Sequence, residues 1–181
     1  MAPIYDLTFL NLPGYQQAAH DLIERLEVSI YDAALDVGCG TGLLTLSLAK
    51  QARCTIGLDL SLAMLKKQAL KSSRQGLNIE LLHGSILKLP ITDHEFTVIT
   101  TAFMLLYLTP KEKQQALVEI KRMLAPGGRV GFLSSRGEIA DIFLSRNEWE
   151  TLLTEAGFSD IQIEERYDIF RLVTAQKREV I

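Results

Sequence analysis

Three glycines and two aspartates are the residues whose types and spacing suggest chemistry. Gly38, Gly40 and Gly42 stand within five residues, directly after a short apolar run that contains Asp36. Because glycine has no Cβ and tolerates positive φ, such a turn lets a ligand approach the backbone closely. A second apolar run ends at Asp59, where a carboxylate accepts hydrogen bonds from the two hydroxyls of a bound ribose. This combination predicts a nucleoside site.

The spacing of the glycines discriminates between classes of nucleotide. The dinucleotide fingerprint G-x-G-x-x-G/A requires a small third residue so that the helix packs closely on the strand. Here the pattern is G-x-G-x-G, and Leu43 follows the last glycine. The phosphate-binding pattern G-x-x-x-x-G-K-[ST] does not occur in the sequence. A nicotinamide oxidoreductase and a P-loop nucleotidase are therefore both disfavoured.

The elements that position these residues alternate in type along the chain. Apolar, β-rich runs separated by helical patterns are typical of a parallel sheet built from βαβ units. We expect strands at residues 33–37, 54–59, 78–83, 96–101, 129–134, 161–165 and 169–175. A tight turn joins the last two strands, so that pair is antiparallel. We expect helices at residues 14–27, 43–50, 61–73, 110–125 and 145–156, the last two opened by capping boxes at Thr109/Glu112 and Ser145/Glu148. The helix after the glycine turn is expected to point free N–H groups at the ligand.

Length and composition exclude several classes of protein. The 181 residues suit one domain, and the net charge of −3 gives no basic surplus for nucleic-acid binding. No apolar run approaches the roughly 20 residues of a membrane span, and the first residues do not resemble a signal peptide. Cys39 and Cys54 lack the spacing of metal ligands, so we expect no metal and two free thiols in a reducing cytoplasm.

Several motifs, in order, resemble those of the class I S-adenosylmethionine-dependent methyltransferases. LDVGCGTG at 35–42 resembles the first motif, and GLDLS with Met64 resembles the ribose-binding strand end and the helix beside the adenine. HGSILKLP, FTVITTAFMLLYL and MLAPGGRVGFL resemble the segments around the third, fourth and fifth strands. The resemblance covers residues 31–177 and implies a Rossmann-like three-layer α/β sandwich: a mostly parallel seven-stranded sheet with a C-terminal antiparallel hairpin. Residues 1–30 then form an N-terminal cap helix region of the same single domain, 1–181.

The resemblance implies S-adenosyl-L-methionine as the cofactor and a set of residues that contact it. That set is Asp36, Gly38, Cys39, Gly40, Gly42, Asp59, Leu60, Met64, Gly84, Ser85, Ile86, Thr101 and Phe103. Three positions depart from the family pattern. Ser85 stands where an Asp commonly receives the adenine amino group, and Thr97 stands where an Asp is usual, a more structural position. Leu106 and Tyr107 stand where small-molecule members often have a His pair.

The methyl acceptor is expected to be a small molecule. The chain lacks the N/D-P-P-Y/F tetrapeptide of amino-methylating members after the fourth strand, and neither cysteine lies in a segment suited to cytosine methylation. Tyr107 is the candidate catalytic residue on the acceptor side. Other aromatic side chains are candidates for an apolar pocket wall, namely Tyr5, Phe9, Tyr15, Phe103 and Phe143. His20, Glu138 and Asp141 are weaker candidates for a base.

The sequence leaves a second function open. The same glycine turn and aspartates fit a non-catalytic module that binds S-adenosylmethionine or S-adenosylhomocysteine and acts with a partner protein. Turnover of an acceptor separates the two hypotheses. Whether the chain works with a protein partner or as a homo-oligomer is not fixed by the sequence.

Overall fold

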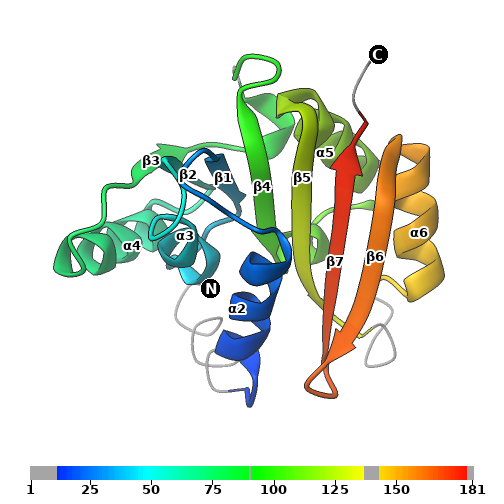
Figure 1. Cartoon of the computed structure of the whole chain (residues 1–181), viewed down its shortest axis with the longest axis horizontal. Helices are drawn as coiled ribbons and strands as arrows, with labels where there is room; N and C mark the ends of the chain where they lie inside the picture. Colours follow the sequence, from blue (N-terminus) through cyan, green and yellow to red (C-terminus); the bar gives the residue numbers. More distant parts are fainter. Residues whose placement is uncertain (1–11, 90, 137–142, 179–181) are drawn as a thin grey trace.

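The computed structural model describes residues 12–89, 91–136 and 143–178. Within these residues it contains one seven-stranded sheet (Figure 1). The strand order is β3-β2-β1-β4-β5-β7-β6. The pairs among the first five strands are parallel, and β7 pairs antiparallel with both β5 and β6. The predicted architecture, a mostly parallel sheet with a C-terminal antiparallel hairpin, is therefore confirmed.

The strands match their predicted positions closely. They are β1 Ala33–Val37, β2 Cys54–Asp59, β3 Glu80–His83, β4 Phe96–Ala102, β5 Leu124–Ser135, β6 Phe158–Arg166 and β7 Phe170–Lys177. The main difference is β5, which begins five residues before the predicted residue 129. Leu124 pairs with Phe96, and the register then shifts before Arg129 pairs with Val98. The Pro126-Gly127-Gly128 segment is thus an irregular part of the strand and not a loop that precedes it.

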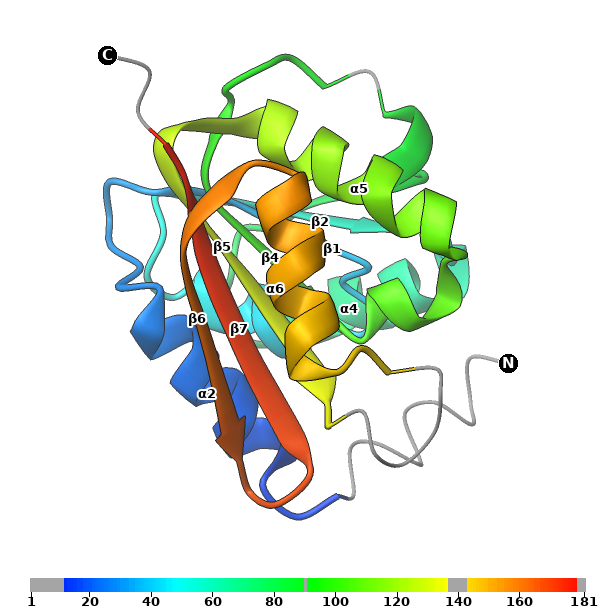
Figure 2. The same ribbon diagram turned by 90° about the vertical axis from the view of Figure 1, so that its right-hand side faces the viewer.

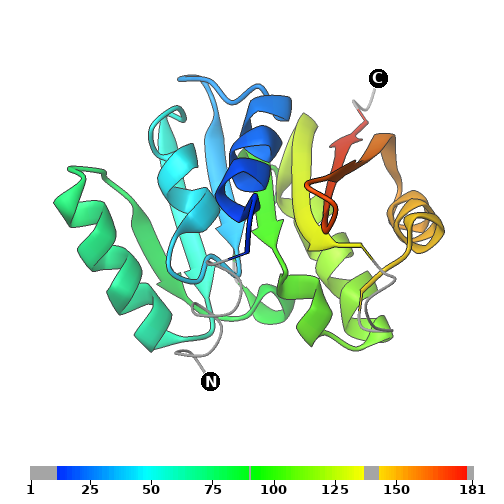
Figure 3. The ribbon, with the colours of Figure 1, turned by 90° about the horizontal axis from the view of Figure 1, so that it is seen from below.

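Helices cover both faces of the sheet. They are α2 Tyr15–Arg25, α3 Leu43–Leu48, α4 Leu62–Arg74, α5 Pro110–Met123 and α6 Arg146–Glu155, with short 3₁₀ helices η1 Ile86–Lys88 and η2 Met104–Tyr107. α2, α3 and α4 lie on one face, and α5 and α6 lie on the other (Figures 2 and 3). Both predicted capping boxes are present at the starts of α5 and α6. None of the helices in the described ranges is long and apolar enough to cross a lipid bilayer.

Alternating strand residues supply the two cores between these layers. Leu35, Val37 and Ile99 pack with α5 and α6, whereas Ala34 and Val98 pack with α2 and α3. Thr97 has the structural role expected of it. Its hydroxyl donates to Asp32 Oδ1 at 2.7 Å and accepts from the backbone N–H of Ala33 at 3.0 Å, linking β4 to the start of β1.

The strand order reverses at β1, which lies between β2 and β4. In open α/β sheets a ligand binds beyond the carboxyl ends of the strands at such a switch point. The loops that follow β1, β2 and β4 meet there. They carry the glycine turn, Asp59 and η2.

Candidate functional site

The glycine turn is fixed to the end of β2 by backbone hydrogen bonds. Gly38 N and Cys39 N both donate to the Leu58 carbonyl oxygen, at 2.8 and 2.9 Å. Gly38, Gly40 and Gly42 have φ values of 69°, 54° and 97°, in the left-handed region that favours glycine. The three glycines are therefore required by the backbone conformation of the turn itself.

Asp59 and Gly40 form the open part of the site. Asp59 Oδ2 accepts from Gly40 N at 2.8 Å, and Oδ1 accepts from Ser61 N at 2.8 Å. A Cβ built on Gly40 would have no described atom within 4 Å. A held carboxylate therefore borders a backbone surface with space above it. Each carboxylate oxygen has further lone pairs that ribose hydroxyls can use, so these residues fit a nucleoside cofactor.

Asp36 lies beneath the turn and is 1% exposed. Its carboxylate accepts from Thr45 Oγ1 at 2.5 Å and from Thr100 Oγ1 at 3.0 Å. Burial raises the pKa of Asp36 to about 7, although these two hydrogen bonds oppose the rise. A cationic ligand nearby favours the ionised form of such a carboxyl group. Neither threonine was identified by sequence reasoning, because hydroxyl residues inside a helix or strand carry no motif.

The predicted adenine-side residues surround the ends of β2 and β3. Leu60 is 70% exposed, whereas Met64 and Ile86 are buried. Gly84 N donates to the Asp59 carbonyl oxygen at 3.1 Å, so the two loops are tied together. The Ser85 hydroxyl accepts from Leu87 N at 3.2 Å and caps η1.

Cys39 lies against β2, and Gly42 lies against α4. A Cβ on Gly57 of β2 would approach Cys39 Sγ to 3.0 Å, and a Cβ on Gly42 would approach Gln68 Cγ of α4 to 3.1 Å. Burial raises the pKa of the Cys39 thiol, so it stays protonated near neutral pH. Cys39 and Gly42 therefore allow the turn to pack closely on β2 and α4.

The residues after β4 separate into buried and exposed positions. Phe103 has φ 58° and packs in an aromatic cluster with Tyr15 and Phe170, at ring-centroid distances of 5.9 and 6.3 Å. Thr101 is buried, whereas Tyr107 is 66% exposed at the end of η2. Partial burial raises the pKa of Tyr107, so its phenol stays protonated near neutral pH.

A small cavity of about 20 Å³, open to solvent on one side, lies beyond the ends of β4 and β5. Its lining comes from the end of β4, η2, the start of α5, the end of β5 and the segment that enters α6. The lining residues are Thr101, Phe103, Met104, Leu105, Leu106, Lys113, Phe132, Leu133, Ser134, Phe143, Leu144 and Trp149. Phe103 and Phe143, both predicted as pocket walls, line it, and Tyr107 does not. Sequence reasoning missed Lys113 and Trp149, which occur in ordinary helical patterns.

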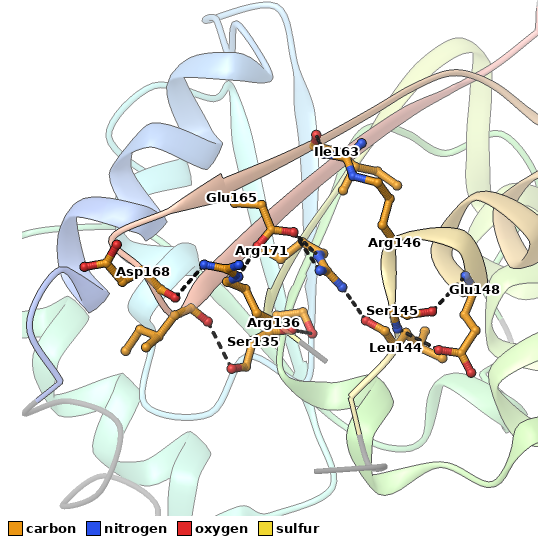
Figure 4. A network of polar contacts seen from close by, with 12 residues as sticks. Ser135, Arg136, Leu144, Ser145, Arg146, Glu148, Ile163, Glu165, Asp168 and Arg171 are labelled. Atoms are coloured by element: carbon orange, nitrogen blue, oxygen red, sulfur yellow. Dashed lines mark hydrogen bonds and ion pairs between the residues drawn. The ribbon is translucent and has the colours of Figure 1, made fainter. Parts of the chain in front are cut away.

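A network of arginine contacts links β6 and β7 to Leu144, one of the residues that line this cavity (Figure 4). Arg171 donates to Glu165 Oε1 through Nε and Nη2, at 3.0 and 2.6 Å, and to the Leu144 carbonyl oxygen through Nη1 at 2.5 Å. Arg136 Nε lies 2.5 Å from Glu165 Oε2, and its Nη1 donates to the Asp168 carbonyl oxygen at 3.1 Å. The β6-β7 pair thereby fixes the chain on both sides of residues 137–142.

The remaining predicted candidates fall elsewhere. His20 is exposed on α2 beside Glu24. The other two histidines were not among the candidates. His83 ends β3 and contacts the Leu60 carbonyl oxygen at 3.0 Å, and His94 contacts that of Leu124 at 3.1 Å. Tyr5, Phe9, Glu138 and Asp141 lie outside the described residues.

Comparison with known proteins gives a domain family for most of the sheet's parallel half. A family model described as a methyltransferase domain matches residues 34–128, which is more than half of the chain. Demethylmenaquinone methyltransferases from Lactobacillus johnsonii and Lactiplantibacillus plantarum are 37% and 34% identical to the chain. The alignments cover 75% and 72% of the chain but 57% of each relative, so the chain spans less than two thirds of these proteins.

Solved structures share the fold. The crystal structure of an S-adenosylmethionine-dependent methyltransferase from Aquifex aeolicus superposes with a TM-score of 0.80 at 21% identity. The superposition covers 93% of this chain and 95% of that one. At this identity the likeness establishes the arrangement of the helices and strands.

Proposed function

Because the chain belongs to the class I S-adenosylmethionine-dependent methyltransferases, we propose that it transfers a methyl group from S-adenosylmethionine to a small-molecule acceptor. The observation that carries the proposal is the relation between Gly40 and Asp59. A carboxylate held by a backbone N–H at 2.8 Å borders a turn whose middle glycine faces open space. This arrangement suits a ribose that rests on the turn with its hydroxyls on the carboxylate.

We assign the cofactor-binding roles by position. Asp59 binds the ribose hydroxyls, and Leu60, Met64 and Ile86 surround the adenine together with Gly84 and Ser85. Gly38, Cys39, Gly40 and Gly42 provide the surface of the turn. Thr101, near the end of β4, and Phe103, just after it, lie toward the methionine portion. Asp36 acts from beneath the turn, where its carboxylate stabilises positive charge.

The residues of the chain contribute to the rate of methyl transfer mainly by positioning the cofactor and the acceptor. The bound cofactor supplies a sulfonium-activated methyl group, and holding a nucleophile at near-attack distance in a dry pocket supplies much of the rate. Met104 packs against Gly38 and also lines the cavity, so the acceptor pocket adjoins the cofactor turn. We place Tyr107 at the edge of the acceptor site, where its protonated phenol orients the acceptor through a hydrogen bond.

The test is turnover with methyl-labelled S-adenosylmethionine. The first acceptor to supply is the compound in the names of the relatives, demethylmenaquinone, in its oxidised and its reduced form. We expect labelled product and stoichiometric S-adenosylhomocysteine, and both should fall at least tenfold in Asp59→Ala. Tight cofactor binding without turnover of any acceptor in a quinol, phenol and thiol panel would overturn the catalytic proposal in favour of a binding module.

A further inference from the structure

Helix α4 lies at one end of the sheet and presents a long face to solvent. It packs beside β3, the edge strand, at the end of the molecule opposite β6 and α6 (Figures 1 and 3). The inner face of α4 consists of four buried residues, Met64, Leu65, Gln68 and Ser72. The residues on the opposite face are exposed, so that face is available to a partner.

Leucines and cations alternate along this outer face. Leu62, Lys66, Leu70 and Arg74 follow one another at intervals of four residues, which places them in one row along the helix. All four are exposed, and Leu62 and Leu70 are 54% and 61% exposed. Single exposed leucines are common on soluble proteins. Two leucines in one row, each followed by a cation one turn later, instead form a surface that is both apolar and basic.

The charge of α4 differs from that of the other charged helices. α2, α5 and α6 each contain acidic and basic residues, whereas α4 contains four cations and no acidic residue. The helix dipole favours cations only near the last turn, so it accounts for Lys71 and Arg74 but not for Lys66 and Lys67. Lys71 also donates to Thr41 Oγ1 at 2.9 Å, and it thereby holds the glycine turn. The stability of the helix therefore does not explain the basic outer face, in a chain whose net charge is −3.

An anionic lipid surface fits both components of this row. Lysine and arginine side chains are attracted to anionic headgroups, and exposed leucines insert at the boundary between the headgroups and the acyl chains. The methylene groups of Lys66 and Arg74 can lie beside the leucines while their charges stay at the headgroups. Because α4 is the outermost described element at this end of the molecule, it can approach a flat surface along its length (Figure 3).

Two other occupants match the row less well. A second copy that docked through the same row would place cations against cations, which opposes association. A nucleic acid would pair with Lys66 and Arg74 through its phosphates but would leave Leu62 and Leu70 without an apolar partner. The combination of leucines and cations therefore favours a surface that is anionic outside and apolar within.

We propose that the outer face of α4 docks the chain on an anionic phospholipid bilayer, with Leu62 and Leu70 inserted at the acyl boundary and Lys66 and Arg74 on the headgroups. This inference concerns where the chain binds and does not depend on the proposed methyl transfer. Vesicle binding is accordingly measured without cofactor and without acceptor.

The first test is sedimentation with vesicles that differ in charge. The purified chain is mixed with sucrose-loaded vesicles of phosphatidylcholine alone, or of phosphatidylcholine with phosphatidylglycerol. We expect binding to the mixed vesicles to be at least tenfold stronger, and to weaken at high salt because salt screens the headgroup charge. Equal binding to both kinds of vesicle, or binding to neither, would overturn the proposal.

Charge variants then locate the contact. Lys66→Gln combined with Arg74→Gln should reduce binding to the mixed vesicles at least tenfold. Lys111→Gln combined with Arg178→Gln is the matched control, because it removes the same charge from exposed positions outside α4. Circular dichroism melts show whether each variant is folded before its binding is measured. Equal losses in the two double variants would assign the binding to net charge and would contradict the role of α4.

A leucine variant tests the apolar part of the contact. Leu70→Gln should weaken binding to the mixed vesicles at least threefold, because a polar side chain loses the acyl contact. Val118→Gln is the control, since Val118 is an apolar side chain of similar exposure on α5. Equal effects of the two substitutions would contradict the insertion of Leu70.

Two further measurements address the other occupants. Sedimentation velocity without lipid reports self-association, and a dimer that Leu70→Gln dissociates would assign the row to a second copy. Soluble polyglutamate represents an acidic macromolecule in solution. Affinity for polyglutamate that equals the affinity for mixed vesicles, and that persists in Leu70→Gln, would assign the row to such a partner. Either result would overturn the lipid proposal, whereas a monomer that prefers the mixed vesicles would support it.

Discussion

Met104 lies directly against Gly38, so that a Cβ on Gly38 would come within 2.8 Å of both Met104 Cβ and Cγ. The contact joins the turn after β1 to the 3₁₀ helix after β4. Met104 also lines the cavity, and the one side chain therefore touches both proposed binding regions. The absence of a side chain at position 38 is what allows this close approach.

Gly38→Ala should accordingly destabilise the fold more than an alanine at a comparable open glycine. Gly76 is the matched control, because its φ of 66° is close to the 69° of Gly38 and a Cβ at position 76 would have no described atom within 4 Å. Left-handed alanine costs about 1–2 kcal/mol at either site, and the collision adds to this at Gly38 alone. Chemical denaturation of both variants measures the difference, and equal losses would contradict the contact.

Asp36 should make stability depend on pH in a defined direction. Burial raises its pKa from 3.8 to about 7, so the folded chain holds a proton that the unfolded chain releases. The contribution of Asp36 to the free energy of unfolding is greatest below pH 3.8, the pKa in the unfolded chain. It falls by about 1 kcal/mol per pH unit as the pH rises from 3.8 to about 7.

The comparison that isolates Asp36 is the variant Asp36→Asn, which keeps the shape of the side chain. The free energy of unfolding of the wild-type protein, minus that of the variant, should decrease between pH 4 and pH 7. Denaturant titrations at pH 4, 5, 6 and 7 measure this difference. A difference that is constant with pH would refute the raised pKa.

Arg171→Met should cost about 1–3 kcal/mol of stability, because the part-buried Leu144 carbonyl oxygen loses its donor and Glu165 keeps only Arg136 as an ion-pair partner. The Arg171 side chain is 5% exposed and also holds the Leu144 carbonyl oxygen. Arg166→Met is the control on the neighbouring strand, since its ion pair with Glu164 is 42% and 36% exposed and is worth less than about 1 kcal/mol. Thermal unfolding of both variants tests the difference, and similar midpoints would contradict the account of the network.

Tyr107→Phe separates an orienting role from a catalytic base. Because the pKa of Tyr107 is raised, its phenol is protonated near neutral pH and cannot act as a base there. We expect kcat to fall by about tenfold, as for a lost orienting hydrogen bond, with no change in cofactor affinity or in the pH profile of kcat. A pH profile that loses a basic limb in the variant would show that the phenol titrates during turnover.

Much of the fold was predictable from local pattern. Ala33–Val37 and Cys54–Asp59 were predicted with their observed bounds, because each is a short apolar run followed by a turn residue that ends it. The capping boxes at Thr109 and Ser145 are likewise local, since both partners lie three residues apart. The start of β5 was missed because a Pro-Gly-Gly segment is typical of a loop, and only pairing with Phe96 makes it part of a strand.

The site was predictable only where a motif marks it. The glycine turn and Asp59 form such a motif, and the structure brings them to 2.8 Å. Thr100 reaches Asp36 across 64 positions of sequence, and Trp149 and Lys113 meet at the cavity from different helices. Contacts of this kind depend on strand order and helix placement, which no local residue pattern indicates. Tyr107, the predicted residue on the acceptor side, is not among the residues that line this cavity, and its role stays a prediction.

The most direct test of the central claim is calorimetric binding of S-adenosylhomocysteine to the wild-type protein, Gly40→Ala and Gly76→Ala. Both glycines have positive φ and open surroundings, so the two variants should lose similar stability. At 100 times the dissociation constant, the ligand should stabilise the wild-type protein by about 2.7 kcal/mol. The account predicts that Gly76→Ala binds like the wild-type protein and that Gly40→Ala binds at least tenfold more weakly. Wild-type affinity in a folded Gly40→Ala variant would contradict the assignment of the site.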